Sequence, residues 1–229
     1  MKQTSFILYN KNVFYYIMDT SQFQTGDILL FHHKNNFSSL TKGLFSIFTD
    51  IIMWWTKSKY SHCAIVVRDP NFLGEEKKGL YVLESSYETF EDSEDGEYKL
   101  GCELEEFDKV VGDYQKNGGS VYWRRLNCER NQQFYENLSE AHSVLHNRPY
   151  DINLVDWIKA AFQIEKGNNQ NKKRFWCSAL VAFVYVKFGF LKQDTPWNLI
   201  TAKMFGTEQQ DNNLLEFSNC TLDNEVQIV

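Results

Sequence analysis

Short apolar runs separated by polar turns predict several β-strands along the chain. Thr25-Gly26-Asp27 predicts a turn into a buried strand, because residues that favour turns directly precede the run Ile-Leu-Leu-Phe. The same pattern predicts strands over 28–31, 60–67, 80–85 and 120–126. The second and third of these strands flank a turn-rich stretch, so we expect them to form an antiparallel hairpin.

Apolar residues at spacings of three and four predict helices over 40–56 and 130–147. The run 179–190 is apolar on nearly every side, which predicts a central buried helix. Residues 40–56 carry apolar residues beyond one stripe. We prefer a helix buried on two sides, with a wall of an apolar substrate site or a membrane-surface patch over 44–55 as alternatives. The order of strands and helices predicts an α+β domain built on a small antiparallel sheet.

Composition narrows the class of protein. A chain of 229 residues and 27.0 kDa favours a single domain over 1–229. The net charge of −6 argues against non-specific binding to nucleic acid. The five cysteines are widely spaced without a CxxC pair, so we expect an intracellular, cytoplasmic setting rather than a disulfide framework. We expect neither a signal peptide nor a transmembrane segment, because no apolar run approaches about 18 residues.

A histidine and a glutamate fall on the two strands of the expected hairpin. Its turn signals span 69–79, centred near 74, and pairing His62 with Glu84 requires a centre at 73. Alternation puts His62 on the face of Ala64 and Glu84 on the face of Val82. The two can therefore be cross-strand neighbours, although a register slip of one or two residues remains open. A carboxylate beside a histidine orients it as a base; a purely structural pair is the alternative.

Cys177 begins the long apolar run, directly after the basic residues 172–174. We expect Cys177 and Ser178 in the first helical turn, where unpaired backbone N–H groups and the helix dipole favour a thiolate. The same N–H groups can receive an oxyanion. Taken alone, Cys177 is more simply a structural core residue, but together with the histidine–glutamate hairpin it becomes a candidate nucleophile. Alternation sends Cys63 away from His62, so we expect Cys63 to be a small buried core residue.

Other polar residues give weaker signals. His142 and His146 lie four apart on a predicted helix, but no HExxH pattern or nearby acidic and cysteine cluster accompanies them, so we predict no metal site there. His32 and His33 are expected to be exposed or structural. The acidic stretch 88–97 does not have the spacing of a calcium-binding EF-hand loop, and we expect it to be solvated.

Five stretches occur in a characteristic order: TGDILLF, YSHCAIVV, YVLESS, RPYD and FWCSALVAFVY. This order resembles the circularly permuted branch of the NlpC-like papain-fold cysteine hydrolases, which includes bacterial and poxvirus proteins. Lecithin:retinol acyltransferase is a more distant relative of that branch. The histidine precedes the cysteine here, as in the permuted branch. The resemblance spans about 22–190, which leaves 191–229 as a C-terminal extension of the single domain.

The resemblance implies a role for each matching residue. Cys177 matches the family's nucleophile, His62 its base and Glu84 its third polar residue. Gly26-Asp27 matches the turn before the first strand, and Tyr150 in the Tyr-Asp motif is a weak candidate for lining the site. The long acidic insert after Glu84 departs from the family pattern, so the family's substrate preference does not carry over.

The function implied is a thiol hydrolase or acyltransferase of permuted papain-like fold. Its substrate would be a small molecule, lipid or peptide carrying an acyl group, and the backbone N–H of Cys177 would help to hold the oxyanion. No cofactor, metal or stable partner is implied. The competing hypothesis is a catalytically inactive binding module that keeps the fold.

Overall fold

The computed structural model describes residues 19–33, 59–73, 77–149, 176–207 and 214–229. The expected helix 40–56 with its patch 44–55, Tyr150 and the basic residues 172–174 lie outside these residues.

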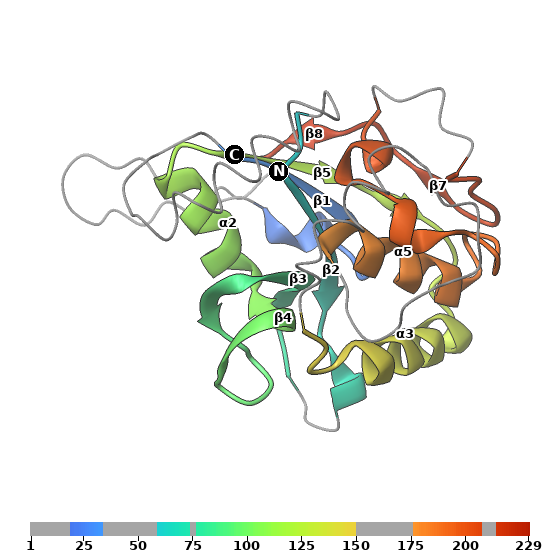
Figure 1. Ribbon diagram of the computed structural model, residues 1–229, viewed down its shortest axis with the longest axis horizontal. Coiled ribbons are helices and arrows are strands. Elements are labelled where there is room, and N and C mark those ends of the chain that lie inside the picture. Colours follow the sequence, from blue (N-terminus) through green and yellow to red (C-terminus); the bar gives the residue numbers. More distant parts are fainter. Residues whose placement is uncertain (1–18, 34–58, 74–76, 150–175, 208–213) are drawn as a thin grey trace, which may run out of the picture.

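A twisted antiparallel sheet of six strands forms the centre of the described structure, in the order β4-β3-β2-β1-β5-β8 (Figure 1). Every pairing in it is antiparallel. The strands are β1 (Ile28–His32), β2 (His62–Arg68), β3 (Leu80–Glu91), β4 (Tyr98–Glu106), β5 (Ser120–Arg124) and β8 (Val226–Gln227). A second sheet pairs β6 (Leu126–Asn127) with β7 (Thr221–Leu222).

Three α-helices accompany the sheet among the described residues: α2 (Phe107–Lys116), α3 (Gln132–Leu145) and α5 (Cys177–Phe188). Four short 3-10 helices join them: η1 (Thr20–Gln22), η2 (Asn71–Leu73), η3 (Trp197–Leu199) and η4 (Ala202–Phe205). The expected α+β class is confirmed, as are the helices that begin near 130 and 177. None of the helices in the described segments is both long and apolar enough to cross a bilayer.

Alternation along the strands divides the core into two layers (Figure 1). Cys63, Ile65 and Val67 face α3 and α5, whereas Ala64 and Val66 face α2. Every residue of α5 except Lys187 is buried, because the sheet, α3 and the chain after α5 surround this helix. The side chains of Trp197 and Phe205 from that last segment are fully buried beside it.

Gly26 shapes the turn that leads into β1. Its φ is 95°, and a Cβ there would lie 2.7 Å from a methyl group of Leu126. The Tyr185 hydroxyl on α5 donates a hydrogen bond of 2.7 Å to the Gly26 carbonyl oxygen. The turn therefore joins the sheet to the central helix.

The prediction that residues 88–97 form a solvated loop is wrong in two respects. β3 continues to Glu91, and the turn that follows buries Asp92, which is 1% exposed and accepts a hydrogen bond of 2.6 Å from the Lys99 ammonium. The next strand, β4, was missed because glutamates alternate with its apolar residues. A charged position normally indicates a solvated face, but here these glutamates are inside the protein.

Candidate active site

His62 and Glu84 are in contact, as the hairpin predicted, although the register differs. β2 and β3 pair Ile65 with Leu83, which centres the hairpin at 74 and puts Glu84 opposite Ala64 when the register is continued. The predicted register, with His62 directly opposite Glu84, is therefore wrong by two positions. A slip of two leaves both side chains on one face, and Nε2 of His62 is hydrogen-bonded to Oε2 of Glu84.

Their surroundings favour a charged pair. The side chains of His62 and Glu84 are 13% and 4% exposed, so solvent screens their attraction weakly. Burial alone lowers the pKa of His62, but the charges of Glu84 and of a Cys177 thiolate outweigh it and raise that pKa to about 10. Because Nε2 faces Glu84, Nδ1 is the ring nitrogen left for another partner.

Cys177 is the first residue of α5, after Trp176 at the N-cap, and it is 8% exposed. No side chain caps this helix end, so the backbone N–H groups of the first turn remain available to a thiolate or an oxyanion. The hydrogen bond from the Cys63 thiol has the largest effect on Cys177 and lowers its pKa. Together with the charge of His62 it overcomes burial, so the pKa of the Cys177 thiol lies well below the ordinary value.

An opening in the sheet explains how Cys177 reaches His62. Cys177 belongs to the α5 layer together with Cys63, whereas His62 lies on the α2 face of the same strand. The β2–β3 register begins only at Ile65, so the start of β2 lies outside that ladder. The backbone N–H of Cys63 also donates to the Cys177 sulfur. The start of α5 thus meets β2 at the part of this strand that is not paired with β3.

Cys63 and Ser178 have roles that the sequence did not indicate. Cys63 is fully buried in the core, as expected, and burial raises the pKa of its thiol, which keeps it a donor to Cys177. The Ser178 hydroxyl donates a hydrogen bond of 2.7 Å to the Ile200 carbonyl, which also accepts from the Trp176 indole at 3.2 Å. The Ser178 side chain therefore anchors the start of α5, and only its backbone N–H remains a candidate oxyanion donor.

Two buried glutamates of β4 complete the surroundings of Glu84. Glu103 lies directly opposite Glu84, Glu105 is two residues further along the strand, and each is 1% exposed. The carboxylate oxygens of all three lie within 4.8 Å of one another. Burial, and then the neighbouring carboxylates, raise the pKa of Glu103 to about 8 and that of Glu105 to about 10. Both glutamates of β4 are therefore mainly neutral near pH 7.

Because the pKa of Glu105 is raised, we expect Glu105→Gln to stabilise the fold relative to wild type, by an amount that depends on pH. The unfolded chain releases this proton above about pH 4.5, whereas the folded protein keeps it until about pH 10, so folding becomes less favourable as pH rises between these values. Glutamine removes this effect and keeps the oxygen that accepts from the Phe90 N–H. Urea unfolding of Glu105→Gln should show a stability relative to wild type that increases from pH 5 to pH 9, by at most about 1.4 kcal/mol per pH unit.

The matched control is Glu106→Gln, at the exposed neighbouring position, whose difference from wild type should stay constant with pH. A constant difference for Glu105→Gln as well would contradict the assignment of Glu105 as a buried neutral acid.

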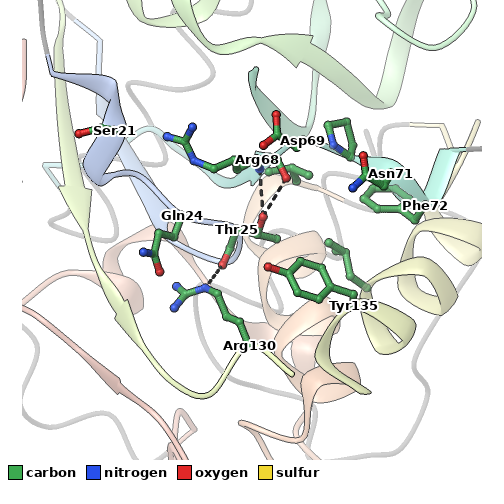
Figure 2. A pocket seen from close by; sticks show the side chains of 12 residues that line it. Ser21, Gln24, Thr25, Arg68, Asp69, Asn71, Phe72, Arg130 and Tyr135 are labelled. Carbon is green, nitrogen blue, oxygen red and sulfur yellow. Dashed lines mark hydrogen bonds between the residues drawn. The ribbon is translucent and has the colours of Figure 1, made fainter. Parts of the chain in front are cut away.

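The cleft shown in Figure 2 is separate from this cluster. The cleft has a volume of about 630 Å³. One of its lining residues, Arg68, is the last residue of β2, whereas His62 is the first residue of that strand. Six residues of a strand span roughly 20 Å. Thr25 holds the two sides of the cleft together, because its side-chain oxygen accepts from the Arg68 N–H at 3.0 Å and its carbonyl from Arg130 at 2.8 Å. Neither Cys177 nor Glu84 lines the cleft.

Comparisons with known proteins give little further guidance. No protein-family model and no curated protein matches the chain. Among solved structures, the crystal structure of the metalloprotein yiiX from Escherichia coli O157:H7 is similar, with a TM-score of 0.43 and 19% sequence identity. The similarity covers 72% of this chain and spans about 65% of that chain. At this level it shows neither a shared fold nor a shared activity.

Proposed function

We propose that the protein is a thiol-dependent hydrolase or acyltransferase of permuted papain-like fold, acting on an amide, ester or thioester. The observation that carries this proposal is the meeting of three side chains: Cys177 and Glu84 both hydrogen-bond to the imidazole of His62. A nucleophile, a base and an orienting carboxylate are the three parts that nucleophilic catalysis requires. A structural cysteine in an apolar core would instead have a raised pKa, as Cys102 does.

The chemistry follows from these positions. His62 takes the proton of Cys177, and the thiolate attacks the carbonyl carbon of the substrate. Backbone N–H groups at the start of α5 hold the negative charge that develops on the carbonyl oxygen. The tetrahedral intermediate collapses, the bond to the leaving group breaks, and His62 returns its proton to that group. Water or another acceptor, deprotonated by His62, then attacks the acyl-enzyme and releases Cys177.

The acyl-enzyme is the species that tests this proposal. p-Nitrophenyl acetate and octanoate are expected to give a burst of nitrophenol, and peptide mass spectrometry should find the acyl group on Cys177. His62→Ala should abolish the burst, whereas the control Cys128→Ala, at a half-buried cysteine outside the cluster, should retain it. A burst that survives in Cys177→Ala, or wild-type protein that forms no adduct at Cys177, would favour the inactive binding module.

A further inference from the structure

A second group of side chains meets at the tip of the β3–β4 hairpin, apart from the cysteine site. Glu94 lies in the turn between these strands, His142 lies in the last turn of α3, and His146 is the C-cap of that helix. The Nε2 atom of His142 is 2.9 and 3.0 Å from the two carboxylate oxygens of Glu94. The Nδ1 atom of His146 is 3.1 Å from one of them.

These distances are close to those of a tetrahedral metal site. Zinc binds nitrogen and carboxylate oxygen at about 2.0–2.1 Å, which separates neighbouring ligand atoms by about 3.3–3.4 Å. The ligand atoms of Glu94, His142 and His146 lie within 4.8 Å of one another, so side-chain movements can bring all three to the spacing of a tetrahedral site. Two imidazoles and one carboxylate are ligands that zinc prefers, and a water molecule can complete the tetrahedron.

The turn that carries Glu94 is held in place independently of the histidines. Asp92 accepts from the Glu94 N–H at 2.9 Å, and its backbone accepts from the Gly96 N–H at 2.8 Å. Lys99 bridges Asp92 and Asp95, at 2.6 Å to each carboxylate. The backbone of the turn at Glu94 is therefore positioned before any ion arrives, which lowers the ordering cost of binding.

Burial and outer contacts are also those of a metal site with one open side. The side chains of Glu94 and His142 are each 11% exposed, and that of His146 is 38% exposed, which gives an ion a path from solvent. The Phe72 ring packs 5.0 Å from His142 on the inner side. The Nδ2 atom of Asn147 lies 2.9 Å from Nε2 of His146, and a flip of this amide would place its oxygen there to accept the proton once Nδ1 binds a metal.

We propose that Glu94, His142 and His146 form a binding site for a divalent cation of the zinc type, which fastens the β3–β4 turn to α3. The sequence argued against a metal because neither an HExxH pattern nor a nearby acidic and cysteine cluster accompanies the two histidines, but the hairpin brings Glu94 from 48 positions before His142. The site does not depend on the proposed hydrolase function, since none of its ligands belongs to the cysteine cluster.

Zinc binding by the full-length protein tests this site. The protein is dialysed against chelator-buffered Zn²⁺, and bound metal is measured by mass spectrometry of the element. We expect one zinc per chain, and at least an approximately 100-fold weaker affinity in Glu94→Gln and in His146→Ala. The controls are Glu97→Gln, an exposed residue of the same turn, and His33→Ala; both should bind as wild type does.

The free cysteines require a second readout, because a thiolate also binds zinc. X-ray absorption of the bound zinc should show nitrogen and oxygen neighbours without a sulfur shell near about 2.3 Å, and Cys177→Ala should keep the full stoichiometry. Circular dichroism checks that each variant folds. A sulfur shell, loss of zinc in Cys177→Ala, or no zinc retained at micromolar free Zn²⁺ would overturn the proposal and leave Glu94 as a hydrogen-bonded partner of the two histidines.

Discussion

Iodoacetamide is expected to label Cys177 faster than the other four cysteines at pH 6, and His62→Ala should lower that rate about tenfold. A free cysteine with a pKa of about 8.5 is only about 0.3% thiolate at pH 6. The pKa of Cys177 is lowered well below its usual value, so a larger fraction of this thiol is thiolate at that pH. The thiolate fraction can rise by at most about 300-fold, and lower intrinsic nucleophilicity offsets more than about tenfold of this gain, which is why we expect a factor nearer ten than 100.

The pH profile separates this interpretation from simple exposure. Wild-type labelling of Cys177 should depend little on pH from 6 to 9, because the pKa of this thiol is lowered well below its usual value and the pKa of His62 is raised to about 10. In His62→Ala the rate should rise about tenfold per pH unit until the thiol ionises. His33→Ala is the matched control and should keep the flat profile. A wild-type rate that rises with pH as those of Cys128 and Cys220 do would contradict the thiolate–imidazolium pair.

The periodicity of apolar residues was enough to predict helices whose burial follows a single regular pattern along their length. α5 is buried on nearly every side and α3 on one face, and both begin close to where the pattern indicated. β4 was missed, because Glu103 and Glu105 interrupt the apolar pattern with ionisable side chains that the fold buries. Local sequence cannot show that these glutamates are neutral, since their pKa depends on neighbours from other strands.

The sequence predicted which residues form the candidate site, but it did not predict how they are arranged in space. Side-chain parity on β2 and β3 put His62 and Glu84 on one face, and a slip of two residues left that result unchanged. The contribution of Cys63 could not be predicted, because alternation correctly turns its side chain away from His62 while the end of α5 approaches from that other side. Contacts between elements distant in sequence require the fold itself.

The largest effect on stability is expected from Asp27→Ala, at the turn before β1. The Asp27 side chain is fully buried and accepts four hydrogen bonds. The backbone N–H of Gln24 at 3.0 Å and the indole of Trp123 at 2.8 Å donate to one oxygen. The backbone N–H of Leu126 at 3.0 Å and the guanidinium of Arg130 at 3.2 Å donate to the other. This carboxylate therefore joins β1, β5 and the segment leading to α3.

Removing Asp27 leaves four donors without their acceptor, one of them the cationic Arg130, whose side chain is only 14% exposed. Breaking a buried ion pair from one side typically costs about 3–5 kcal/mol, because the remaining charge stays in a poorly solvated place. Urea unfolding should show a loss of this size for Asp27→Ala. Asp108→Ala, at an exposed position in the first turn of α2, should lose no more than about 1 kcal/mol.

If Asp27→Ala does not fold, Asp27→Asn measures the same interaction. Asparagine keeps the shape but turns an NH₂ group toward two of the donors, so it should still lose at least about 1 kcal/mol. A loss smaller than this in both variants would mean that Arg130 and Trp123 find other acceptors. The Gly-Asp pair resembles a family motif, yet its aspartate is buried and bonded within the turn. These hydrogen bonds give Asp27 a role in folding, and they give no support to a catalytic role.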